Sequence, residues 1–202
     1  FFVTNGTSTS NKIVWHYVVA PNDVVVVDRN CHKSVLHAIT MTGAIPLFLT
    51  PTRNHYGIIG PIPLDEFKWK SIAKKIKRHP LLKNGKGGND HDKPRVLTLT
   101  QSTYDGILYN VEMINEQLDG KIDTLHFDEA WLPHAAFHDF YRDMHAIGGI
   151  NAAGVESSRR RNQDSMIFST QSTHKMLAGL SQASQILIRN SKNESLDRYM
   201  FN

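Results

Sequence analysis

Short apolar runs recur along the chain, and stretches with helical spacing separate most of them. Four consecutive valines at 24–27 lie between turn-forming residues, which is typical of a strand buried on both faces of a parallel sheet. Similar runs occupy 44–49, 95–100, 123–127, 166–169 and 185–188, and a first strand precedes Asn5. Amphipathic spacing predicts helices over 10–19, 34–41, 64–78, 109–118 and 136–144. This alternation predicts an α/β fold with a mostly parallel, doubly wound sheet in three layers, α/β/α.

One interior segment does not fit this alternation. Residues 84–94 contain no apolar side chain to bury and are dense in turn formers, which predicts a surface loop. Its glycines match neither the Walker spacing nor the dinucleotide-binding spacing. No internal repeat or linker divides the chain, so residues 1–202 are predicted to form one domain. The chain begins at Phe1 without an initiator methionine and stops at Asn202, so we expect a domain truncated at both ends.

Composition and charge exclude several classes of protein. No apolar run approaches the roughly 18 residues of a membrane span. The chain has 23 basic and 19 acidic residues, and the basic runs at 74–78 and 159–161 lack the interleaved aromatic residues of a single-strand binder. We therefore expect neither a membrane nor a nucleic-acid partner. Cys31 is the only cysteine and cannot form an intrachain disulfide, which favours a cytoplasmic location.

Polar residues gather where the predicted strands end, and ligands of open α/β sheets bind at that edge. The segment 5–10 places a glycine and several hydroxyls at the start of a helix, which suits a phosphate. An ordinary helix cap is the alternative explanation. Asp128 follows the strand at 123–127, where it could pair with a cationic ring nitrogen or cap a turn.

The segment 169–175 delivers hydroxyls, an imidazole and a lysine after another strand. Met176 and Leu177 follow Lys175, and an apolar flank would ease proton loss from its ammonium, as Schiff-base chemistry requires. A surface lysine is the alternative. Taken together, a phosphate loop, a strand-end aspartate and a lysine 47 residues later form the arrangement expected for pyridoxal phosphate.

With these residues, the chain resembles the fold-type I, aspartate-aminotransferase-like, pyridoxal-phosphate enzymes. It resembles more closely the major domain of the bacterial ornithine/lysine/arginine decarboxylases, and the resemblance covers essentially the whole chain. It rests on five blocks in order, at 3–12, 28–34, 57–62, 126–131, and 172–175 with 181–184.

The resemblance implies a role for each residue that matches these blocks. Thr7, Ser8, Ser172 and His174 would hold the cofactor phosphate. His32 would stack on the pyridine ring, and Trp131 would lie beside the ring hydroxyl. Asp128 would bind the ring nitrogen and keep it protonated, and Lys175 would bond covalently to the cofactor aldehyde. Lys175, His32 and Asp128 are the catalytic residues of this hypothesis.

The implied activity is decarboxylation of arginine, lysine or ornithine to the corresponding amine and carbon dioxide. The resemblance also implies a homodimer or a larger homo-oligomer. Two alternatives remain open at this point. The chain could belong to another fold-type I enzyme, such as an aminotransferase or an aldolase, or it could be a non-catalytic fragment. The sequence does not distinguish the basic amino acids from one another.

Two other groups of residues were weighed as chemical sites. Cys31 and His32 are adjacent, so their side chains diverge, and Cys31 is interpreted as buried filler rather than a nucleophile. His134 and His138 stand four residues apart, a spacing that could bind a metal on one helix face. Asp128 or Asp139 could complete such a site, but neither the zincin pattern nor an assigned third ligand is present, so no metal site is predicted.

Overall fold

Seven strands form one sheet in the computed structural model, which describes residues 1–82, 93–147 and 163–201. Its order is β1-β7-β6-β5-β4-β2-β3. The strands are β1 (Phe2–Asn5), β2 (Val24–Asp28), β3 (Ile45–Leu49), β4 (Val96–Thr100), β5 (Thr124–Asp128), β6 (Met166–Ser172) and β7 (Ala183–Arg189). From β3 to β6 every neighbouring pair is parallel, and β7 runs antiparallel to both of its neighbours. The predicted α/β fold with a mostly parallel sheet is confirmed.

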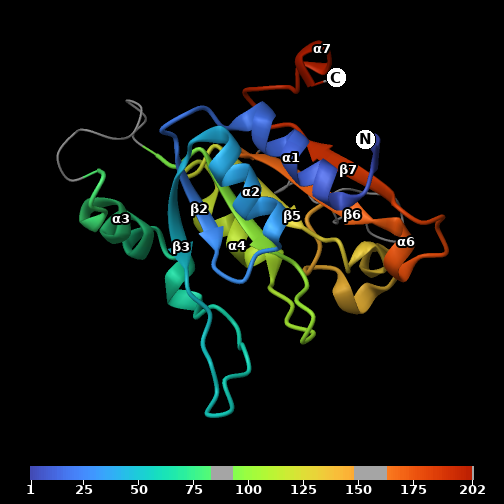
Figure 1. The fold of residues 1–202 in the computed structure, drawn as a ribbon, viewed down its shortest axis with the longest axis horizontal. Coiled ribbons are helices and arrows are strands. Elements are labelled where there is room, and N and C mark those ends of the chain that lie inside the picture. The colour runs from blue at the N-terminus through green and yellow to red at the C-terminus, as the bar shows by residue number, and fades with distance from the viewer. Residues whose placement is uncertain (83–92, 148–162, 202) are drawn as a thin grey trace.

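Helices cover both faces of this sheet, and α1 and α2 lie side by side across one of them (Figure 1). The α-helices are α1 (Thr7–Val18), α2 (Lys33–Thr42), α3 (Trp69–Arg78), α4 (Val111–Leu118), α6 (Thr173–Met176) and α7 (Arg198–Phe201). The 3-10 segments are η1 (Leu64–Phe67), η2 (Pro133–Phe137) and η3 (Asp139–Tyr141). Within the described ranges, no helix has the length and apolar character that crossing a membrane requires.

The valine run forms β2 and is buried on both faces, as its pattern predicts. Val25 and Val27 belong to the core beneath α1 and α2, together with Trp15. Val26 belongs to the opposite core, which η1 and α4 cover. Since side chains alternate across a strand, one uninterrupted apolar run supplies both cores.

The helix predicted over 64–78 is broken in the structure. It consists of η1 and α3, with Lys68 between them in extended backbone. Residues two apart lie about 200° apart around an α-helix, so Phe67 and Trp69 could not both reach the core from a continuous one. The extended residue turns both aromatic side chains onto the same core.

The helix predicted over 136–144 is wrong. The structure has η2 and η3 there, separated by His138 in extended backbone, and the His138 ring accepts the Phe140 N–H. Phe137 is 79% exposed and Phe140 is 67% exposed. These two aromatic residues have the spacing of a buried helix face, but neither is buried.

Several other elements begin or end a few residues away from their predicted boundaries. Helix α1 begins at Thr7 rather than at residue 10, and α4 begins after Asn110, whose side chain accepts the Met113 N–H. Strands β5 and β6 extend to Asp128 and Ser172, so these two residues are strand ends rather than loop residues. The loop predicted at 84–94 falls almost wholly outside the described residues.

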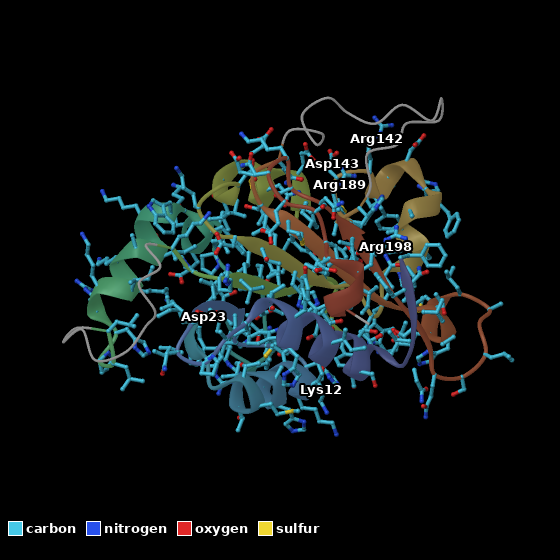
Figure 2. All side chains as sticks on the ribbon, turned by 90° about the horizontal axis from the view of Figure 1, so that it is seen from above. Lys12, Asp23, Arg142, Asp143, Arg189 and Arg198 are labelled. Carbon is cyan, nitrogen blue, oxygen red and sulfur yellow. The ribbon has the colours of Figure 1, made fainter. Side chains whose placement is uncertain are left out.

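The amino ends of the strands carry ion pairs. Figure 2 labels Asp23, which precedes β2 at this edge. Arg95 lies 3.6 Å from the Asp23 carboxylate and 3.0 Å from Asp123 Oδ2, and Lys93 lies 2.6 Å from Asp123 Oδ1. These ion pairs link neighbouring strands at the amino edge of the sheet. The residues predicted to carry chemistry lie at the opposite, carboxyl edge.

Candidate active site

A cavity of about 830 Å³ opens at the carboxyl ends of the parallel strands. Its walls come from the segments that follow β1, β2, β4, β5 and β6. All eight site residues predicted from the sequence line it, namely Thr7, Ser8, His32, Asp128, Trp131, Ser172, His174 and Lys175. The fold therefore brings these eight residues together from four separate parts of the chain, at or after the ends of β1, β2, β5 and β6, while their individual roles stay predictions.

The turn into α1 forms one end of the cavity. Gly6 has φ 83°, a conformation that favours glycine, and a Cβ there would meet nothing within 4 Å. Its carbonyl accepts the N–H groups of Thr9 and Ser10, and no side chain caps the helix. The α1 N-terminus thus faces the cavity beside the Thr7 and Ser8 hydroxyls, an arrangement that favours an anion.

Hydroxyls from three elements meet beside this turn. The Thr7 hydroxyl is hydrogen-bonded to the Ser172 hydroxyl, and it lies 3.3 Å from that of Ser184. Ser184 donates to the Gln171 carbonyl at 2.8 Å. His174 donates from Nδ1 to the Ala183 carbonyl at 2.7 Å, which fixes the ring at the cavity wall. These contacts hold α1, β6 and β7 in register around one pocket.

Asp128 lies at the end of β5 and is only 5% exposed. Its Oδ2 accepts an Asn11 N–H at 2.9 Å, and its Oδ1 accepts the Ala130 N–H at 3.2 Å. Burial raises the pKa of the Asp128 carboxyl, while hydrogen bonding from Asn11 and the nearby His32 and Lys175 oppose that rise. Both hydrogen-bond donors are neutral, so a cationic group in the cavity would stabilise the charged carboxylate.

His32 caps α2 and lines the same cavity. Its Nδ1 accepts the Ser34 N–H at 3.2 Å and lies 2.9 Å from the Ser34 hydroxyl. Burial lowers the pKa of His32, and Lys175 adds to this effect while Asp128 opposes it. We therefore describe His32 as a neutral ring that carries its hydrogen on Nε2.

Lys175 projects from α6 with its ammonium 4.8 Å from the centre of the Trp131 ring. Tyr104 in turn packs edge-on against Trp131, with ring centres 5.4 Å apart. The sequence suggested that Met176 and Leu177 would shield the lysine; Met176 is 49% exposed, and Leu177 is half-buried. The indole of Trp131, which follows β5, is the aromatic surface that the lysine contacts.

The structure also places the two other candidate groups. Cys31 is half-buried and lines the cavity, so it is a wall residue rather than interior filler. Burial raises the pKa of its thiol to about 12, and Asp28 and Asp128 add to this effect, so the thiol stays protonated. His134 and His138 share no α-helical face, and among the described residues no group of three potential ligands could hold a metal ion.

Asn11 is the site residue that sequence reasoning missed. It is 1% exposed, lines the cavity and donates to Asp128, a residue 117 positions away. The available signal was its position four residues after Thr7, which places both on one face of α1.

Comparison with known proteins gives one consistent result. The family model described as "Orn/Lys/Arg decarboxylase, major domain" matches residues 1–202. Lysine decarboxylase LdcA of Pseudomonas aeruginosa is 50% identical over 202 residues, all of this chain and 25% of that protein. The biodegradative arginine decarboxylase of Escherichia coli is 42% identical over 94% of this chain and 24% of that protein. The ornithine decarboxylase of Haemophilus influenzae is 34% identical over 99% of this chain and 26% of that protein.

The solved structures agree with this result. Lysine decarboxylase A from Pseudomonas aeruginosa superposes with a TM-score of 0.85 at 50% identity, covering 99% of this chain and 25% of that one. The chain therefore spans about a quarter of the length of the relatives that it matches.

Proposed function

Since this chain belongs to the family of the Orn/Lys/Arg decarboxylase major domain, we propose that the protein containing it decarboxylates a basic amino acid with pyridoxal phosphate. The single observation that carries the proposal is the convergence of all eight predicted residues on one cavity. Within that protein, this chain would supply the main part of the cofactor site.

The residues present fit that cofactor at both of its ends. A phosphate would be received by the α1 N-terminus, where Thr7 and Ser8 offer hydroxyls and Gly6 leaves the backbone approachable. A protonated pyridine nitrogen would bind the buried Asp128 carboxylate, whose present donors are both neutral. Burial raises the pKa of Asp128, and a cation beside it would reverse that effect.

Each residue of the cavity would contribute one physical task. When bound, pyridoxal phosphate supplies an electron sink for the electron pair that departing carbon dioxide leaves behind. Asp128 would hold a proton at the ring nitrogen, and His32 would fix the tilt of the ring with its neutral imidazole. Lys175 would hold the cofactor covalently through Nζ until substrate displaces it, and Trp131 would shield that amine from water.

Lysine is the substrate to test first. The lysine decarboxylase of Pseudomonas aeruginosa is 50% identical to this chain, the constitutive lysine and the arginine decarboxylases of Escherichia coli are both 42% identical, and the ornithine enzyme is 34% identical. Asp128 is the only carboxylate among the described residues that line the cavity. We infer that recognition of the distal cation depends on parts of the protein beyond the residues described.

The test uses the full-length protein and two measurements. Pyridoxal phosphate is added to the apoprotein, and the visible absorption band of the bound cofactor is recorded for the wild type and for Lys175→Ala. We expect the wild type to gain the band and the variant to lack it. Carboxyl-labelled lysine, arginine and ornithine are then supplied separately, and released carbon dioxide is trapped.

The outcomes separate this proposal from its alternatives. Equal absorption by both variants would reject a covalent role for Lys175. Formation of a keto acid without labelled gas would favour an aminotransferase. Lys33→Ala is a suitable matched control, because Lys33 also lines the cavity but lies at the start of α2. It should keep the absorption band.

A further inference from the structure

A chain of buried polar side chains crosses the face of the sheet that α1 covers. It begins at Trp15 of α1, passes through Thr98, His126 and Thr170 on three adjacent strands, and returns to α1 at Asn11. The three strand residues are each 0% exposed. Val14, Val25 and Phe168 belong to the apolar core on this face, so the polar side chains cross a hydrophobic layer.

The donor direction along this chain follows from the hydrogens that each group owns. The Trp15 indole can only donate, and it donates to the Thr98 hydroxyl at 3.1 Å. At the other end, the Thr170 hydroxyl donates to Asn11 Oδ1 at 2.6 Å, so its oxygen must accept from His126 Nε2 at 3.1 Å.

His126 completes the assignment because it is neutral. Burial lowers the pKa of His126 to about 3, so the ring carries one hydrogen at ordinary pH. With that hydrogen on Nε2, Nδ1 must accept from the Thr98 hydroxyl at 3.1 Å. With this tautomer, all hydrogen bonds from Trp15 to Asn11 point in the same direction.

Asn11 connects this series of hydrogen bonds to the Asp128 carboxylate and the His32 ring of the site. Because its Oδ1 is held by Thr170, its two Nδ2 hydrogens point to Asp128 Oδ2 at 2.9 Å and to Ser34 Oγ at 3.0 Å. The Ser34 hydroxyl is then left to donate to His32 Nδ1 at 2.9 Å. One amide therefore orients both the carboxylate and the imidazole. If the amide flipped, its oxygen would face the Asp128 carboxylate.

We propose that Asn11 is a positioning residue of the active site, and that the relay Thr98–His126–Thr170 holds its amide in the orientation that lets Asp128 and His32 bind a pyridine ring. This inference deepens the proposed function and rests on it. Asn11, Thr170 and His126 would act through Asp128 and His32, without contacting the reacting atoms. Lys12, the next residue on α1, lies on the outer side of that helix in Figure 2.

Thr170 offers the sharpest test, because its hydroxyl can be removed without touching Asp128. Thr170→Val keeps the shape but removes the donor to Asn11 and the acceptor for His126. Thr170→Ser restores both. Thr124 is a matched control, since it lies on β5, is 4% exposed and stands two residues before His126 on the same face.

The measurements are the dissociation constant of pyridoxal phosphate for the full-length apoprotein and the visible absorption of the bound cofactor. For Thr170→Val we expect binding about 5- to 10-fold weaker and an altered band, since an orienting hydrogen bond is lost. Thr170→Ser and Thr124→Val should stay within about twofold of the wild type. Asn11→Asp, which has nearly the same volume but lacks both N–H donors, should weaken binding by about 30-fold or more.

Each outcome decides the matter. If Thr170→Val binds the cofactor like Thr170→Ser, or if Thr124→Val loses as much as Thr170→Val, the relay has no orienting role and the inference is wrong. If Thr170→Val yields too little folded protein, Asn11→Asp makes the decision, and wild-type affinity in that variant would overturn the inference. Failure of the wild type to bind pyridoxal phosphate would overturn the proposed function and this inference with it.

Discussion

Glu129 follows Asp128 directly and is fully buried, yet it faces a different set of partners. Its carboxylate accepts the Ala146 N–H at 2.6 Å, the Ser169 hydroxyl at 2.5 Å and a Gln171 side-chain N–H at 2.9 Å. Burial raises the pKa of Glu129 to about 7 despite these three donors, and the nearby Asp128 adds to the rise. The perturbation to test is Glu129→Gln, which removes the charge and nearly preserves the shape.

The pKa difference between the folded and unfolded states sets the size and sign of the effect. The ordinary pKa of this carboxyl is 4.5, so between that value and about 7 the folded protein holds a proton that the unfolded chain has lost. The associated stability is fully present below pH 4.5 and is lost as the pH rises through about 7. The interval corresponds to about 3 kcal/mol of unfolding free energy.

The assay compares the free energy of unfolding of the two full-length proteins at about pH 5 and about pH 8. Other titrating groups are common to both proteins and largely cancel in the difference. Relative to the wild type, Glu129→Gln should gain about 3 kcal/mol of stability between the two pH values. Glu194→Gln is the control, because Glu194 is an exposed glutamate.

A pH-independent difference between Glu129→Gln and the wild type would refute this reasoning. In that case Glu129 would be charged in the folded protein throughout the range, stabilised by its three donors. A constant offset added to the pH-dependent difference would not contradict it, because a glutamine amide matches the Ala146, Ser169 and Gln171 donors less well at every pH.

Two further predictions concern the two ends of the cavity. Gly6→Ala places a Cβ at φ 83°, which costs about 1 kcal/mol or more, so both stability and the affinity for inorganic phosphate should fall. Gly120→Ala is the control, because it carries a comparable strain at φ 68° beyond α4 and should lower stability without changing phosphate affinity. Equal phosphate affinities of the Gly6→Ala and Gly120→Ala variants would contradict the role of Gly6. Asp128→Asn removes the only carboxylate that lines the described cavity wall, so binding of pyridoxal phosphate should weaken at least about 100-fold by absorption titration. A change of less than about tenfold there would rule out a charge interaction with the ring.

Local pattern was enough to predict the layered architecture and the edge where the site lies. The alternation of apolar runs with helical spacing predicts βαβ units, and right-handed crossovers bring the carboxyl ends of parallel strands together. That is why Thr7, Asp128 and Lys175, each placed just after a strand by pattern alone, line the same cavity in the structure. Hydrophobic periodicity gave a wrong helix over 136–144, because the exposed aromatic residues Phe137 and Phe140 have the spacing of a buried helix face.

Contacts between distant residues were decided only by the order of the strands. Asn11 meets Asp128 because α1 crosses β5 and β6, and the amide is oriented by Thr170, a residue 159 positions away. His126 is neutral because no water or charge reaches it beneath α1, a condition that a single histidine in a strand pattern does not reveal. Hydrophobic periodicity is a local property of the chain, whereas hydrogen-bond partners and desolvation depend on which segments the packed sheet makes neighbours.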